Sequence, residues 1–249
     1  GDNLVPHANA KTTWMTDAEV KVAVEETKLR GKRVAVHARS ADSVKQAVRL
    51  GCEVIYHASF TDNEALDLLE ANKDKIFVAP GLSVIFKLLY EGAAYGIPPA
   101  KAREMGYEEE LAAATESMKA MHKRGVRVLP GGDYGFAWAP HGTNATDLQY
   151  FVKHCGMTAM EALMSATRYG GQIMLMGNEL GEVKEGYLAD LLLVDGDPLA
   201  DLGRVDRRSR QQPRRNHSPR HARPSHRQRW NHRSDQPPDS RALAHAEHA

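Results

Sequence analysis

Two histidines and an aspartate each follow a short apolar run of this chain. His37 ends the run Val-Ala-Val-His, His57 ends Val-Ile-Tyr-His, and Asp133 follows Val-Arg-Val-Leu-Pro-Gly-Gly. Imidazole and carboxylate groups are common ligands of zinc and other first-row metals, and such sites often keep one position open for water. Because metal binding can lower the pKa of water to about 7, these residue types are suited to hydrolysis at neutral pH.

The elements between these residues must bring them together. Helical stretches are expected at residues 18–30, 43–50 and 62–71, alternating with strands that end at His37, at His57 and near residue 80. This order is typical of βαβ units and predicts a parallel α/β sheet. Since chemistry gathers at the carboxyl ends of parallel strands, the three side chains are expected at one mouth.

The spacing leaves two interpretations open. A single histidine at a strand end is more often a structural residue than a ligand. His37 and His57, however, lie about one β-plus-α step apart, and Asp133 follows two glycines at a later strand end. In the functional interpretation Asp133 both ligates the metal and carries a proton.

The remaining elements are expected around this mouth. Glycines, prolines and aromatic residues loosen the pattern over residues 81–107, and the segment 134–145 follows Asp133. Both segments are candidates for substrate contacts, because long loops at strand ends commonly carry them. Further elements are expected as helices near 108–124, 144–154 and 158–175, and as a strand within 182–194 outside the main layers.

Charge divides the chain into two unlike segments. Residues 203–249 hold 12 Arg, no Lys and four acids, so the totals of 33 basic and 32 acidic residues leave 21 and 28 for residues 1–202. The first 202 residues therefore carry a net charge of −7. The last 47 contain so few apolar residues that a disordered tail is expected.

Other features of the sequence limit the classes of function that are expected for this protein. The two cysteines, Cys52 and Cys155, lie in no CxxC pattern and are expected to be packed free thiols. No run of about 18 apolar residues occurs, so no membrane-spanning helix or membrane partner is expected. A cytoplasmic location is the expectation, although the chain starts at Gly1 and any earlier targeting segment would not be visible.

Several motifs keep a common order along residues 1–202. They are Val36-His37-Ala38, Ser40, Val54-Ile55-Tyr56-His57-Ala58, Gly132-Asp133-Tyr134-Gly135, Pro140-His141-Gly142-Thr143-Asn144, Gly181-Glu182-Val183-Lys184-Glu185-Gly186-Tyr187-Leu188-Ala189-Asp190-Leu191 and Asp195-Gly196-Asp197-Pro198. Together they resemble the carboxyl-terminal half of the amidohydrolase superfamily. The branch with imidazolonepropionase-like enzymes and prolidase-type dipeptidases is the most similar.

The resemblance implies a fold and a set of roles. The family has a distorted (β/α)₈ TIM-type barrel with one or two divalent metal ions, usually Zn²⁺, and hydrolyses amide and related bonds. By motif, His37 resembles the ligand on the fifth strand and His57 the ligand on the sixth. Asp133 resembles the aspartate of the eighth strand, which contacts the metal and transfers the proton.

The departures from the family pattern are equally specific. No His-x-His occurs in residues 1–202, and the family's fourth-strand lysine would also lie upstream of Gly1. The resemblance therefore predicts an incomplete barrel of about strands five to eight over residues 1–178. Residues 179–202 are expected to be a segment of the family's small β-sandwich, and 203–249 a disordered tail. We hypothesise that the tail is a frameshift product, which sequencing of the locus would test.

The expected function is metal-dependent hydrolysis of a carbon–nitrogen bond in a small amide, cyclic amide or dipeptide-like substrate. A metal-activated hydroxide would attack the carbonyl, and Asp133 would pass the proton to the leaving nitrogen. His141, Tyr134 and Arg39 are the candidates for substrate binding, against the alternatives of a loop residue, a rim aromatic and the start of a helix. Weak or no activity is expected of the half-barrel alone. Homo-oligomerisation of half-barrels could restore closure, but it would not supply the missing His-x-His and lysine.

The arginine-rich tail suggests a function from another class. Twelve Arg would attract polyanions by counterion release, so a non-catalytic fragment that binds nucleic acid non-specifically is the alternative. No nucleic-acid-binding motif accompanies the tail. Specific nucleic-acid binding is therefore not expected.

Overall fold

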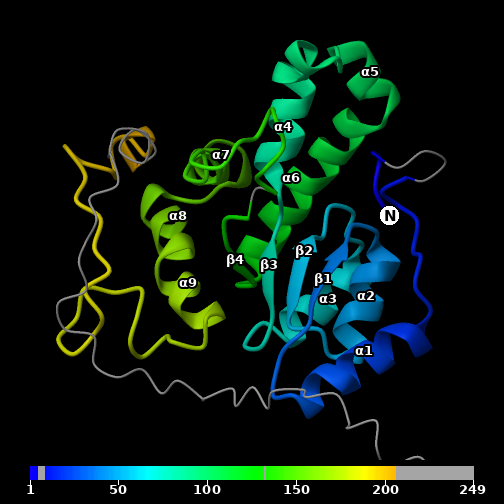
Figure 1. Cartoon of the computed structure of the whole chain (residues 1–249), viewed down its shortest axis with the longest axis horizontal. Helices are drawn as coiled ribbons and strands as arrows, with labels where there is room; N and C mark the ends of the chain where they lie inside the picture. The colour runs from blue at the N-terminus through cyan, green and yellow to red at the C-terminus, as the bar shows by residue number, and fades with distance from the viewer. Residues whose placement is uncertain (5–8, 132, 206–249) are drawn as a thin grey trace, which may run out of the picture. The chain divides into compact units, whose positions relative to one another are not determined.

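A parallel β-sheet forms the centre of the structure (Figure 1). The computed structural model describes residues 1–4, 9–131 and 133–205, which fall within one compact unit, Gly1–Gln212. The arginine-rich tail lies outside the described residues from position 206 onward. Its predicted disorder, its polyanion binding and its proposed frameshift therefore stay predictions.

The sheet has four strands in the order of the chain, and every neighbouring pair is parallel. The strands are β1 (Ala35–Ala38), β2 (Val54–His57), β3 (Phe77–Ala79) and β4 (Arg127–Val128). In the register of the first pair, Ala38 lies opposite His57 and His37 opposite Tyr56. This arrangement confirms the predicted α/β class with a parallel sheet.

Three helices precede or connect these strands and follow the sequence signals closely. They are α1 (Asp17–Leu29), α2 (Ala41–Leu50) and α3 (Asn63–Ala71). Thr16 and Glu19 form the expected capping box at the start of α1. Gly51 ends α2 in the left-handed conformation, at φ +87°, where glycine carries no steric penalty. Asp62 caps α3 through the backbone N–H of Ala65.

The segment after β3 is helical, which corrects the expectation of a loosened stretch over residues 81–107. It forms α4 (Leu82–Glu91), the 3₁₀ helix η1 (Gly92–Tyr95) and α5 (Pro99–Glu104), followed by α6 (Tyr107–Lys123). The physical reason is burial: Leu82, Ile85 and Leu89 repeat at helical spacing and are almost fully buried. In Figure 1, α4 and α5 extend beyond the carboxyl ends of the strands.

The helices expected near 144–154 and 158–175 are observed as three shorter helices. They are α7 (Thr146–Cys155), α8 (Ala159–Ala166) and α9 (Arg168–Ile173). The single helix expected at 158–175 is interrupted at Thr167, whose φ and ψ of −101° and −74° depart from helical values. A capping box of Thr158 and Glu161 begins α8.

The strand expected within residues 182–194 is wrong for this structure. Residues 174–202 contain turns, bends and irregular backbone but no strand. Leu191 and Leu193 are 69% and 80% exposed, so the apolar run that suggested a strand is not buried as a core strand would be. The described strands all belong to the four-stranded sheet, which does not include this run. The predicted β-sandwich segment at 179–202 stays a prediction.

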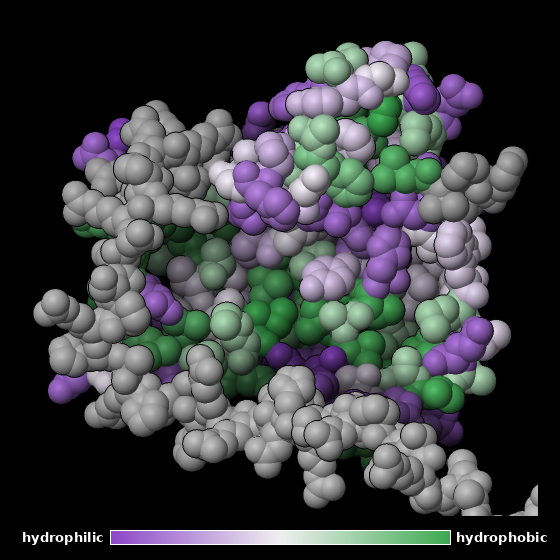
Figure 2. Space-filling model, in the orientation of Figure 1, coloured by the Kyte–Doolittle hydropathy of each residue, from purple (hydrophilic) through white to green (hydrophobic). Residues whose placement is uncertain are grey.

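The core lies between the sheet and its helices, while one sheet face stays open. Tyr56 has a strand neighbour on either side, yet it is 43% exposed. Figure 2 shows apolar surface gathered over the middle of the strands. Cys52 and Cys155 are both buried free thiols, as expected. Within the described residues, no helix is both long enough and apolar enough to cross a membrane.

Candidate functional site: a histidine pair at the mouth of the sheet

The strand ends bring three of the predicted residues to one cavity of about 340 Å³. We call it the histidine cavity; it is lined by His37, Tyr56, His57, Gly131, Asp133 and Tyr134. The imidazole rings of His37 and His57 lie edge to face, with centroids 4.5 Å apart and planes inclined by 66°. Neighbouring parallel strands thus place the two imidazoles in contact, as the spacing of one βα unit predicts.

His57 is held in the neutral form with one free ring nitrogen. It is 4% exposed, and burial lowers its pKa well below the usual value, assisted by the charges of Arg39 and His37. Its Nδ1 atom is buried and has no hydrogen-bond partner. A neutral imidazole with an available lone pair is the form that ligates metals. Gly81 lies so close that a Cβ there would be 3.0 Å from Nδ1.

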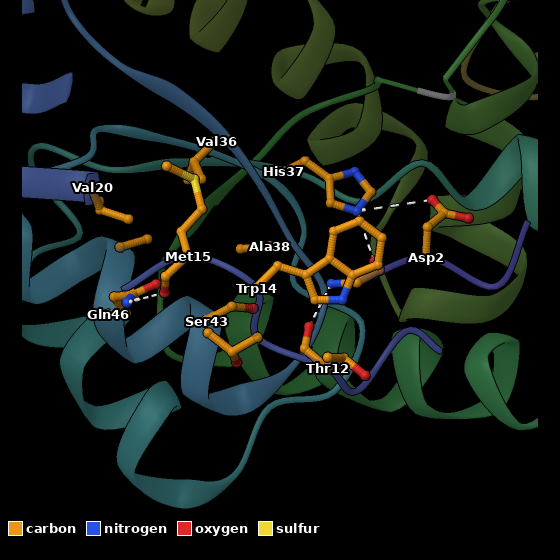
Figure 3. A pocket seen from close by; sticks show the side chains of 13 residues that line it. Asp2, Thr12, Trp14, Met15, Val20, Val36, His37, Ala38, Ser43 and Gln46 are labelled. Atoms are coloured by element: carbon orange, nitrogen blue, oxygen red, sulfur yellow. Dashed lines mark hydrogen bonds and ion pairs between the residues drawn. The ribbon is translucent and has the colours of Figure 1, made fainter. Parts of the chain in front are cut away.

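His37 has a different environment, shared with the N-terminal segment. Its side chain is 43% exposed, and its Nε2 lies 2.9 Å from the carbonyl oxygen of Gly1 and 3.9 Å from Asp2 Oδ2. It also lines a neighbouring cavity of about 200 Å³, where Figure 3 shows it next to Trp14. Binding of a metal through Nε2 would therefore require the N-terminal segment to release this atom.

Asp133 reaches the histidine cavity from the loop after β4. Gly131 approaches β3 so closely that a Cβ there would lie 2.6 Å from the Cβ of Ala79, so the loop requires glycine at this position. Both His57 and Asp133 adopt the left-handed conformation, at φ +76° and +57°. Such backbone strain in residues other than glycine clusters at active sites and ligand clamps.

The donor set fits a metal ion only in part. His57 offers a neutral, unpartnered nitrogen, and His37 and Asp133 line the same cavity. The described residues nevertheless contain no group of three His, Cys, Asp or Glu side chains close enough to hold a metal ion. The imidazoles of His37 and His57 are thus in contact, and Asp133 lines the same cavity but does not complete a three-ligand site with them.

The predicted substrate-binding residues are distributed over different places. Tyr134 lines the histidine cavity, and its hydroxyl donates to the carbonyl oxygen of Asn144 at 2.8 Å. His141 lines another cavity instead, between α4 and α7. Arg39 is 2% exposed and does not line the histidine cavity. The structure therefore brings Tyr134, but neither Arg39 nor His141, beside the histidine pair.

Arg39 belongs to a buried ion network that the sequence did not predict. Its guanidinium donates to Glu110, which is fully buried in α6, and to Asp2 at 3.1 Å. Burial alone would lower the pKa of Arg39, but the two carboxylates together raise it. Glu110 also accepts hydrogen bonds from Ser59 and Asn3, at 2.9 and 2.8 Å. This network fixes the chain on both sides of the histidine pair.

A second buried carboxylate, Asp147 in α7, holds the loop that carries Asp133. Asp147 is fully buried and accepts hydrogen bonds from the backbone N–H groups of Gly131 and Ser83, at 3.0 and 3.2 Å. Burial raises its pKa, and the hydrogen bonds from Ser83 and Gly131 offset this in part. Sequence reasoning overlooked Asp147, although its spacing of four from Phe151 and eight from Cys155 places it on a buried stripe.

Comparison with known proteins decides the family. The model of the amidohydrolase family matches residues 5–212, which is most of the chain. The chain belongs to the amidohydrolase family. The resemblance inferred from the sequence motifs is thereby confirmed, and members of this family generally bind divalent metal ions.

The relatives of this amidohydrolase chain include enzymes of known activity. It is 29% identical to the ochratoxinase of Aspergillus niger over 202 residues, which cover 78% of this chain and 39% of that protein. A solved Xaa-Pro dipeptidase with bound methionine in its active site has 29% identity and a TM-score of 0.69, covering 79% and 47% of the two chains.

A prolidase complexed with N-methylphosphonate-L-proline gives a similar result. It has 26% identity and a TM-score of 0.72, covering 83% of this chain and 48% of the prolidase. The chain thus spans less than half the length of each of these three relatives.

Proposed function

We propose that this chain is part of a metal-dependent hydrolase that cleaves a carbon–nitrogen bond in a small amide or dipeptide-like substrate. The histidine pair carries the proposal, because a neutral, buried and unpartnered imidazole contacts a second imidazole at adjacent strand ends. Family membership supports it, and the ochratoxinase and dipeptidase relatives suggest the class of bond.

His37 and His57 would hold the metal ion, for which Zn²⁺ is the expected identity, with Asp133 as the third ligand from the same cavity. When bound, the metal ion would lower the pKa of a water molecule to about 7. Asp133 would accept the proton of that water and return it to the leaving nitrogen. Tyr134, in the same cavity, would orient the substrate; contacts by Arg39 and His141 would require movement of their segments.

We further propose that the four strands correspond to strands five to eight of the family's barrel. Two observations support this: the sheet has four parallel strands with an open face, and the match covers less than half of each relative. Two unpaired edges would remain, at β1 and β4, and closing a barrel removes such edges. A second copy could supply closure, which the molar mass in solution would reveal.

The decisive experiment measures zinc and turnover together. We expect the purified chain to bind zinc, and His57→Asn to weaken that binding by at least about tenfold, since even changes in groups behind the ligands cost 10- to 100-fold. His122→Asn is the matched control, because His122 lies on α6 and pairs with Glu161. Equal zinc affinity in the two variants would contradict the metal assignment.

Catalysis is tested separately on N-acyl and dipeptide substrates. If the chain turns over any of them, Asp133→Asn is expected to abolish hydrolysis while zinc binding by the histidine pair persists. Retained hydrolysis in Asp133→Asn would remove this residue from the mechanism. Zinc binding without turnover is the result expected if further barrel strands are required.

A further inference from the structure

The carboxylate of Asp147 joins two turns that border the histidine cavity. Asp147 lies in α7, is fully buried and does not itself line that cavity. One turn follows β3 and contains Ser83, and the other follows β4 and contains Gly131. Each turn donates a backbone N–H to the carboxylate, at 3.2 and 3.0 Å. The position of Asp147 therefore fixes the carboxyl ends of β3 and β4 relative to each other.

The same carboxylate contacts the chain on both sides of Asp133. Gly131, two residues before Asp133, donates its N–H to Asp147 Oδ2. The hydroxyl of Tyr134, one residue after Asp133, is a further hydrogen-bond partner of the carboxylate. The proton of this hydroxyl is shared with the carbonyl oxygen of Asn144, which lies 2.8 Å away. Because a residue spans at most about 3.6 Å, contacts so close on either side leave the backbone of Asp133 little room to move.

The backbone conformation of Asp133 needs such support. Its φ is +57°, in the left-handed region that residues with a Cβ adopt uncommonly. A residue stays in a sparsely populated conformation only where the surrounding structure over-determines it. The contacts of Asp147 on the two sides of Asp133 supply this constraint. Since φ sets the direction of the Cα–Cβ bond, the same constraint determines where the Asp133 carboxylate points.

The other turn that Asp147 holds lies against His57. Ser83 donates both its backbone N–H and its hydroxyl to Asp147 Oδ1. Two residues earlier, Gly81 is so close to the imidazole of His57 that a Cβ there would be 3.0 Å from Nδ1. Asp147 thus ties the turn behind His57 to the turn that carries Asp133.

We propose that Asp147 is a positioning residue for Asp133. Its contacts keep Asp133 in the left-handed conformation and direct the Asp133 carboxylate into the histidine cavity beside His57. Asp147 acts through Asp133 and touches neither the substrate nor the metal ion. This role rests on the proposed function, in which Asp133 ligates the metal ion and moves a proton.

The conformation of Asp133 is measured first, in the metal-free chain. Its Cα and Cβ chemical shifts report whether φ is left-handed, and a chelator removes any metal. We expect left-handed shifts in the wild type and a change toward extended values in Asp147→Asn, which keeps only one acceptor oxygen for its donors. Asp62→Asn is the matched control, because Asp62 also accepts a backbone N–H, from Ala65, but does not line the histidine cavity. It should leave the shifts of Asp133 unchanged.

Zinc affinity then tests whether Asp147 acts through Asp133. Asp147→Asn is expected to weaken zinc binding by about tenfold, the lower end of the loss for groups behind metal ligands. In a chain that already carries Asp133→Asn, the histidine pair still binds zinc, and the same substitution should change the affinity by less than about twofold. A residue that only stabilises the fold would change the zinc affinity equally in both chains. If Asp147→Asn does not fold, Ser83→Ala removes a hydroxyl that holds Asp147 and should show a smaller effect with the same dependence on Asp133.

Two results would overturn the proposal. They are left-handed shifts of Asp133 that persist unchanged in Asp147→Asn, and equal changes in zinc affinity with and without Asp133→Asn. If His57→Asn still weakens zinc binding in that case, the proposed function stands and only the role of Asp147 is lost. A wild-type chain that binds no zinc would instead count against the metal assignment. The chemical shifts of the metal-free chain would then decide whether Asp147 positions Asp133.

Discussion

Two fully buried carboxylates hold the two sides of the sheet's mouth in different ways. Glu110, on the side of β1 and β2, forms an ion pair with buried Arg39. Asp147, behind the loop after β4, has neutral hydrogen-bond donors, among them Ser83 and Gly131. A buried charge without an opposite charge is costly, which is why burial raises the pKa of Asp147. The first side is thus fixed by paired charges and the second by hydrogen bonds alone.

This difference predicts unequal costs when each carboxylate is neutralised. Glu110→Gln leaves the guanidinium of Arg39 buried, with Asp2 as its one remaining ion-pair partner among the described residues. Breaking a buried ion pair by removing one partner costs about 3–5 kcal/mol. We therefore expect Glu110→Gln to lower the free energy of unfolding by about that amount, the largest effect in this comparison. Denaturant unfolding of the full chain measures it.

A neighbouring glutamate provides the matched control. Glu108 lies in the same first turn of α6 but is exposed. Glu108→Gln should change the free energy of unfolding by no more than about 0.5 kcal/mol. Replacing both partners, in Glu110→Leu with Arg39→Met, should recover part of the loss because both charges of the fully buried pair are then removed, while Asp2 is partly exposed to water. A Glu110→Gln loss as small as that of Glu108→Gln would break the distinction between the two sides.

The sequence predicted the strands and the caps of the fold but not these buried carboxylates. Strand ends at His37 and His57 follow from local apolar runs, and Thr16 caps α1 by a local pattern. Glu110 stands beside two exposed glutamates, so composition alone does not tell which one turns inward. Only the buried stripe that α6 acquires by packing selects it, and such tertiary burial is not a local property.

The candidate site also combines features that follow from local sequence with features that depend on tertiary packing. The contact of the two imidazoles was predictable, because parallel neighbouring strands place residues one βα unit apart side by side. The positions of Arg39 and His141 were not, since each depends on partners far along the chain. Arg39 contacts Glu110 from α6, and His141 lines a cavity together with residues of α4. Long-range packing therefore decides which of the candidate polar residues face the histidine pair.

Neutralising Asp147, behind the loop after β4, is expected to have the intermediate effect on the free energy of unfolding. Asp147→Asn removes a charge that burial already disfavours, but it leaves one fewer acceptor for the N–H of Gly131. The net worth of such a hydrogen bond is about 1 kcal/mol, and we expect a loss of that size. Asp42→Asn is the control, since Asp42 also lies in the first turn of a helix but is exposed. A loss as large as that of Glu110→Gln would show that the two sides are held alike.

The pH dependence of the unfolding free energy tests whether Asp147 differs from Glu110 in lacking an opposite charge. It is expected to be the smallest effect. The pKa of Asp147 is raised in the folded chain, so the folded state binds its proton more tightly than the unfolded state does. This contribution to stability is fully present below the unfolded pKa of about 3.9 and is lost as the pH rises through the folded pKa. The unfolding free energy of the wild type, minus that of Asp147→Asn, should therefore increase on acidification toward pH 4. The slope cannot exceed about 1.4 kcal/mol per pH unit for one proton. A difference that stays constant from pH 7 to pH 4 would mean that Asp147 bears its charge without cost.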